Sequence, residues 1–180
     1  MKNSIKIFEQ LGLVALFLFL LPINAQESPK LSDPEIASVA VVANQIDIDF
    51  ANIALKKTRN KEVADFAKRM IEDHKAVIAQ AVALVNKLGV DPKDNVVSQS
   101  LLKDAEITKT TLEKTSKKEF DKRYIDNEVA YHEKIIGAVK GLLIPESNNQ
   151  ELKELLETVV PALEVHLGHA QMIQKEINSK

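Results

Sequence analysis

Apolar residues recur along this chain at alternating spacings of four and three, and that repeat restricts the fold to packed α-helices. The clearest runs fall within residues 63–88, 125–143 and 152–177, and a looser one covers 36–54. On a helix, this spacing places every member of a run on one stripe, which is buried against neighbouring helices. The repeat therefore predicts an all-α fold in which four long helices form an antiparallel bundle.

Capping signals divide the chain into these helices. Ser32 or Asp33 can start the first helix and Asn60 the second, because their side chains accept hydrogen bonds from free backbone amides. Gly89 can end the second helix in a left-handed conformation. A shorter, more polar segment at about 96–115 predicts an extra helix in the connection between the second and third long helices.

The second half of the chain carries two similar start signals. Ser116 and Asn148 are each followed three residues later by Glu, which is the capping-box pattern. We expect the third long helix to run from Ser116 to Gly141, or to end just before Pro145, and the fourth to start at Asn148. The helical bundle domain is thus predicted at residues 34–178.

Residues 1–25 have the pattern of a secretory signal peptide. A basic start precedes an unbroken apolar run at 11–21 and a small residue, Ala25. A run of this length fits a signal peptide better than a membrane span, which needs about 20 residues. We expect cleavage before Gln26, a polar leader at 26–33, and a periplasmic protein with no membrane span. The alternative is an uncleaved N-terminal anchor, which also places the folded part outside the cytoplasm.

Composition excludes several kinds of chemistry. The chain has no Cys, so disulfides, thiolate metal ligands and a Cys nucleophile are excluded. Its formal charge is −2, and it has no Trp, few aromatic residues and no basic block. Nucleic acid is therefore not an expected partner. No Ser-His-Asp arrangement or phosphate-binding Gly loop can be recognised, so the sequence assigns no catalytic residues and gives no positive sign of an enzyme.

Three of the four histidines occupy positions at which the repeat calls for an apolar residue. His74, His132 and His166 each lie near the middle of a different predicted helix, and Asp47 has the matching place in the first helix. Long helices that run side by side bring such positions to about one level of the bundle. Two further residues can share faces with these histidines: Glu128, four residues before His132, and His169, three after His166.

Two readings of this polar layer are open. Imidazole and carboxylate groups in mid-bundle can form a metal site, because a divalent cation such as copper, zinc or iron offsets the cost of burying them. The alternative is a hydrogen-bonded layer in which acids accept from histidines and fix the helix register without a metal.

Three segments of the chain carry a family resemblance. They are Phe66–His74, then Phe120–Ile125 leading to His132-Glu133-Lys134, and Pro161–Leu167. Their sequences and order resemble the signature blocks of the bacterial family called domain of unknown function 4142, over about residues 33–177. The resemblance implies an exported protein with a ferritin-like bundle, and members are often labelled outer membrane proteins without a demonstrated activity.

The resemblance invites a ferritin-type di-iron assignment, but the residues do not fit it. That chemistry uses Glu followed three residues later by His on each of two helices. The residues three before His74, His132, His166 and His169 are Ile71, Val129, Leu163 and His166. A mononuclear, His-rich site is therefore the better prediction if a metal binds.

Two functions remain as expectations. The first is a periplasmic bundle that binds one divalent metal ion through His74, His132 and His166. Asp47, Glu128 and His169 would then be further ligands or would orient the imidazoles. The second is a non-catalytic structural or interaction protein of the cell envelope, related to stress, whose partner is another envelope protein.

Overall fold

The computed structural model describes residues 30–179, and within that range the chain is entirely helical, with no strand. The elements are α1 (Asp33–Lys57), α2 (Lys61–Leu88), α3 (Val96–Lys114), α4 (Lys117–Ala138), the π-helical turn η1 (Val139–Leu143), α5 (Ile144–Glu146) and α6 (Gln150–Asn178). The predicted signal peptide, residues 1–25, and the first half of the predicted leader, residues 26–29, lie outside the described residues.

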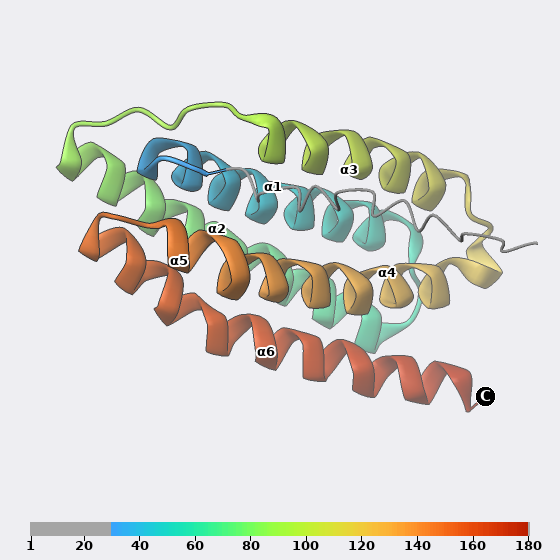
Figure 1. Ribbon diagram of the computed structural model, residues 1–180. Coiled ribbons are helices and arrows are strands. Elements are labelled where there is room, and N and C mark those ends of the chain that lie inside the picture. Colours follow the sequence, from blue (N-terminus) through green and yellow to red (C-terminus); the bar gives the residue numbers. More distant parts are fainter. Residues whose placement is uncertain (1–29, 180) are drawn as a thin grey trace, which may run out of the picture.

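Helices α1, α2, α4 and α6 lie side by side, and α3 runs along α1 on the outside (Figure 1). Because α3 carries the chain back along the length of the bundle, α2 and α4 point in the same direction (Figure 1). The contacting pairs α1–α2, α2–α6, α4–α6 and α1–α4 are each antiparallel, as predicted. The extra helix in the connection is also present where the sequence predicted it.

Both ends of α3 are fixed to α1 by hydrogen bonds. The Lys57 ammonium donates to the carbonyl oxygens of Leu112 at 2.9 Å and Thr115 at 2.8 Å, at the C-terminal end of α3. At its N-terminal end, the Asn95 side-chain amide donates to the carbonyl oxygen of Glu35 at 3.1 Å. A cation near the last carbonyls of a helix also interacts favourably with the helix dipole.

Most predicted helix boundaries are confirmed. The side chain of Asn60 accepts from the amide of Glu62, and Gly89 ends α2 with a φ of 64°, a conformation that Gly adopts without strain. The predicted start of the last helix at Asn148 is wrong by one residue, because Asn149 caps α6. The Asn148 amide instead donates to the carboxylate of Asp33 at 2.8 Å, which joins the starts of α6 and α1.

The third long helix does not stop before Pro145. Its α-helical part ends at Ala138, and the chain then continues as η1 and α5 to Glu146. Pro145 lies in α5, which directly follows the π-helical turn within this continuous helical stretch.

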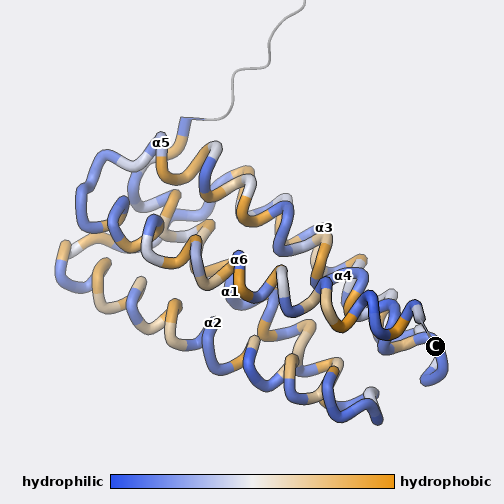
Figure 2. Tube along the Cα trace, turned by 90° about the horizontal axis from the view of Figure 1, so that it is seen from below, coloured by the Kyte–Doolittle hydropathy of each residue, from blue (hydrophilic) through white to orange (hydrophobic). Residues whose placement is uncertain are grey.

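Apolar and hydrophilic residues alternate in short stretches along every long helix, as Figure 2 shows. The strict four-three repeat nevertheless misplaces some buried positions. In α6 Val160 is buried and Val159 is only half-buried, and in α4 Ile135 is buried where Ile136 was predicted. An α-helix has 3.6 residues per turn, so a straight helix drifts away from a repeat of 3.5.

The largest buried aromatic side chains lie in one half of the bundle. Phe50, Phe66, Phe120 and Tyr124 are at most 1% exposed, and all lie toward the end at which α1 passes into α2. The rings of Phe120 and Tyr124 are stacked, with centroids 6.2 Å apart. The half on the other side of the histidines is built from Ala, Val, Leu and Ile.

Helix α1 is long and apolar enough to cross a membrane, judged by length and composition alone. In its most apolar window 56% of the residues are buried inside the bundle, and a buried core helix passes the same test. Asp47, which is fully buried, lies in this helix.

Candidate metal centre

Each of the four bundle helices contributes to one buried polar layer. Asp47 comes from α1, His74 from α2, Glu128 and His132 from α4, and the last histidine from α6 (His166). None of these five side chains is more than 4% exposed. The three imidazole rings form a triangle, with centroids 5.9, 5.3 and 5.5 Å apart.

One nitrogen of each ring makes a hydrogen bond at the edge of the layer. His74 Nδ1 lies 2.6 Å from Asn44 Oδ1, and His132 Nδ1 lies 2.9 Å from the carbonyl oxygen of Glu128. On the third ring, His166 Nε2 lies 2.8 Å from a carboxylate oxygen of Asp73.

These partners fix which nitrogen carries the proton. A carbonyl oxygen and an ionised carboxylate can only accept. The Asn44 amide nitrogen already donates to the Ala40 carbonyl at 2.8 Å, so Asn44 presents its oxygen to His74. The bonded nitrogen of each neutral ring is therefore the N–H donor, and the other nitrogen has a free lone pair.

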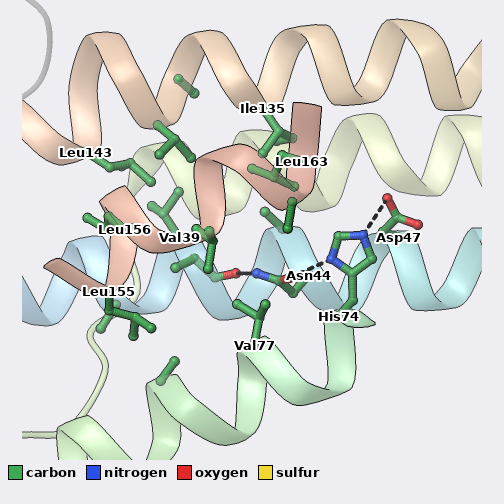
Figure 3. Close-up of a pocket in the computed structure, with 18 of the residues that line it drawn as sticks. Val39, Asn44, Asp47, His74, Val77, Ile135, Leu143, Leu155, Leu156 and Leu163 are labelled. Atoms are coloured by element: carbon green, nitrogen blue, oxygen red, sulfur yellow. Dashed lines mark hydrogen bonds and ion pairs between the residues drawn. The ribbon is translucent and has the colours of Figure 1, made fainter. Parts of the chain in front are cut away.

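Those second nitrogens are buried at the centre of the layer. His74 Nε2, His132 Nε2 and His166 Nδ1 make no hydrogen bond with any described residue. One ring nitrogen from each histidine lies within 4.8 Å of the other two. Asp47 Oδ2 lies 3.3 Å from His74 Nε2 and 3.6 Å from His132 Nε2, so a carboxylate faces the same point (Figure 3).

A second group of possible ligands shares His132 with the first. Asp47, Glu128 and His132 each offer one ligand atom within 4.8 Å of the others. Glu128 Oε2 lies 3.7 Å from His132 Nδ1, and neither carboxylate oxygen of Glu128 has a hydrogen-bond partner among the described residues. Both buried groups could hold a metal ion.

The protonation states of the layer follow from burial and mutual contacts. Burial by itself would raise the pKa of Asp47, but the facing histidines, His74 first, outweigh it, so the pKa of Asp47 is lowered. Burial and the charge of Asp47 raise the pKa of Glu128 well above its usual value. The two carboxyl groups of the layer are therefore shifted apart, with the ionised form favoured for Asp47 and the protonated form for Glu128.

Two of the imidazoles are held neutral. Burial lowers the pKa of His132 against the opposing effect of Asp47. Burial also lowers the pKa of His166 to about 4, although its hydrogen bond to Asp73 acts in the opposite direction. Neutral imidazole is the form that ligates a metal, so these two rings are ready to bind without losing a proton.

A comparison with known protein families matches this helical domain to one family. The model of the family described as Domain of unknown function (DUF4142) matches residues 20–173. The chain belongs to this family. No curated protein and no solved structure matches this chain.

Five of the six residues predicted for the site lie together in the polar layer of this DUF4142 domain. The sixth, His169, lies outside that layer. The ring of His169 packs edge-on against Phe66, with centroids 5.3 Å apart, and it belongs to neither ligand group. It lies one turn beyond His166, but that turn carries it toward the aromatic half of the bundle.

Sequence reasoning missed the two side chains that orient His74 and His166. Asn44 lies three residues before Asp47 and therefore on the same helical face, a spacing that could have revealed it. Asp73 directly precedes His74 in the sequence but contacts His166 on another helix. No local pattern indicates that contact.

Proposed function

We propose that this protein is an exported helical bundle that binds one divalent metal ion through His74, His132, His166 and the carboxylate of Asp47. The observation that carries the proposal is the orientation of the three rings. Each donates from one nitrogen to a fixed acceptor and points the other, unpartnered nitrogen at a shared centre. Metal-bound histidines are held in this way by carbonyl and carboxylate partners.

A polar layer that only fixed helix register would satisfy its own hydrogen bonds. Here both oxygens of Asp47, both of Glu128 and one nitrogen of each histidine in the layer are buried without a hydrogen bond. Each such group costs about 1–3 kcal/mol when left unpaired. A cation that accepts the lone pairs removes this cost, which favours the metal site over the purely structural layer.

The donor set limits the choice of metal. Three imidazole nitrogens and one carboxylate oxygen suit Zn²⁺, Cu²⁺ or Fe²⁺, and the chain has no thiolate to select a softer ion. One ion is proposed, because the Glu-x-x-His pairs of ferritin-type di-iron sites are absent and His132 is common to both ligand groups. Glu128 is then either a further ligand or a partner that orients His132.

Fold and location are part of the same proposal. A ferritin-like topology is supported by the lengthwise crossover through α3, which leaves α2 and α4 parallel (Figure 1), and by candidate ligands that are buried at mid-bundle. Export to the periplasm is supported by the signal-peptide pattern of residues 1–25.

The experiment is calorimetric titration of metal-free, untagged protein with Zn²⁺, Cu²⁺ and anaerobic Fe²⁺. Single changes of His74, His132 or His166 to Ala should each weaken binding by more than the roughly 10–100-fold that loss of an outer partner costs. His169→Ala is the matched control and should bind like wild type.

Two results would contradict the proposal. One is a wild type that binds none of these ions more tightly than about 100 μM. The other is equal metal binding by wild type and the three variants, which would leave the histidines as a structural layer in a protein of the cell envelope.

A further inference from the structure

A cavity of about 560 Å³ opens directly onto the histidine layer. It occupies the half of the bundle without Phe, between α1, α2, α4 with η1, and α6, and it reaches as far as Leu143 and Leu152 (Figure 3). Its volume lies within the range of about 300–1,000 Å³ that is typical of small-molecule sites.

The packing of this half explains why space remains. Along α1 the lining residues include Ala37, Ala40 and Ala43, whose side chains are too short to fill the centre. Tyr131 is the one Phe, Tyr or Trp residue among the lining residues, and its hydroxyl is held by the Ala43 carbonyl at 2.8 Å. The aromatic rings that fill the other half have no counterpart here.

The cavity has a polar floor and apolar walls. Asp47, His74, His132 and His166 all line it, whereas Glu128 does not. The histidine layer therefore closes one end of the cavity. The remaining polar lining residues outside this layer are mostly exposed and lie at the rim; they include Gln80, Ser100, Lys134 and Thr158.

The shape favours a chain-like occupant. Lining residues extend from Ala37 to Asp47 along α1 and from His74 to Val85 along α2. At 1.5 Å per residue, either stretch measures roughly 15 Å. Neighbouring helix axes lie only about 8–10 Å apart, so the space between them is long and narrow.

We propose that the cavity binds a single-chain aliphatic carboxylate, with its alkyl tail along the apolar walls and its carboxylate on the metal ion at the floor. This inference rests on the proposed function. The acidic side chain of Asp47 lines the floor of the cavity and disfavours an anionic head group there, and a bound divalent ion reverses that preference. The structure thus couples the two ligands, and each should tighten binding of the other.

The test titrates alkyl carboxylates into dialysed protein, zinc-loaded and metal-free, by calorimetry. Dodecanoate should bind the zinc-loaded wild type roughly 100-fold more tightly than octanoate, because four more methylene groups are buried. It should also bind more tightly than dodecyltrimethylammonium, which has an equal tail and a cationic head. Removal of zinc should weaken dodecanoate binding at least about 5-fold, the low end of a typical coupling between sites.

A pair of neighbouring substitutions separates cavity binding from adsorption to the surface. Ala81 is buried in the cavity wall about two turns from His74, and Val82 beside it is 43% exposed. Ala81→Phe should abolish dodecanoate binding and keep zinc affinity, whereas Val82→Phe should keep both. Circular dichroism and a thermal melt check that each variant folds, and the chain-length series on wild type needs no variant.

The outcomes distinguish this inference from the proposed function. A wild type that binds none of Zn²⁺, Cu²⁺ and Fe²⁺ overturns both, and if only one of the other two ions binds, that ion takes the place of zinc in the titrations. Zinc binding without dodecanoate binding, or with equal dodecanoate affinity in the Ala81 and Val82 variants, overturns the cavity ligand alone. Equal dodecanoate affinity with and without zinc, or equal affinity for the cationic amphiphile, overturns the contact between carboxylate and metal.

Discussion

Acidification should lower the stability of the metal-free protein already at pH values above those at which carboxylates titrate. His166 should account for much of that loss of stability. The folded-state pKa of His166 is about 4, against 6.5 for an ordinary histidine. Between these two pH values the unfolded chain binds the proton more readily than the folded one. The stability from neutral, buried His166 is therefore fully present above about pH 6.5 and is lost as pH falls toward 4.

The size of the effect follows from the pKa difference. Each pKa unit between folded and unfolded states is worth about 1.4 kcal/mol, so protonation of His166 costs the folded state about 3 kcal/mol in total. That is a large share of the roughly 5–15 kcal/mol by which a typical domain is stable. Asp73 limits the loss, since its carboxylate can accept from either charge state of the ring.

The assay is urea unfolding of metal-free protein at several pH values between 7.5 and 4.5, for wild type, His166→Gln and His169→Gln. Wild type should lose stability steadily over this range, and His166→Gln should lose about 2–3 kcal/mol less. His169 is the comparison on the same helix: it is only half-buried, and burial lowers its pKa less than that of His166, so His169→Gln should reduce the pH dependence less than His166→Gln does.

One result would refute the reasoning. If wild type gained stability on acidification, and His166→Gln did not, the ion pair with Asp73 would outweigh burial. The ring would then be a charged structural element and not a neutral ligand.

Three further predictions concern packing, the support of the site, and export. Ile125→Ala, at a fully buried position that lines no cavity, should destabilise by up to about 5 kcal/mol, whereas Leu163→Ala, beside the cavity, should cost nearer 2; equal losses in denaturant midpoints would argue against the open half. Asn44→Ala should weaken zinc affinity about 10–100-fold by releasing His74, and unchanged calorimetric affinity would remove Asn44 from the site. Intact-mass analysis of periplasmic protein should show a chain that begins at Gln26, and a retained Met1 would favour the membrane anchor.

Much of the fold could be predicted because helices are specified locally. Asn60, Gly89 and the Ser32–Glu35 pair set boundaries through bonds to backbone groups within a few residues. The errors occur where distant contacts decide. Asn149 is the cap in place of Asn148, and the carboxylate of Asp33, far away in the sequence, accepts from the backbone amides of both residues.

The candidate site likewise has a part that the sequence predicts and a part that it does not. His74, His132, His166 and Asp47 interrupt an apolar repeat, and that interruption is visible in the sequence alone. His169 satisfies the same spacing rule, yet it packs on Phe66. Spacing determines on which face of its own helix a residue lies. It does not determine which neighbouring helix packs against that face.

The sequence by itself determined that this protein is helical, where most helices begin and end, and which polar residues are buried at mid-bundle, because each of these depends on periodicity and local hydrogen bonds. Only the tertiary structure decided that Asp73 orients His166, that the free ring nitrogens share one centre, and that a cavity adjoins them. The cavity exists because short side chains on α1 face helices that bring only one Phe, Tyr or Trp ring, that of Tyr131, to the cavity wall. This is a property of several helices at once, and no single segment of the sequence contains it.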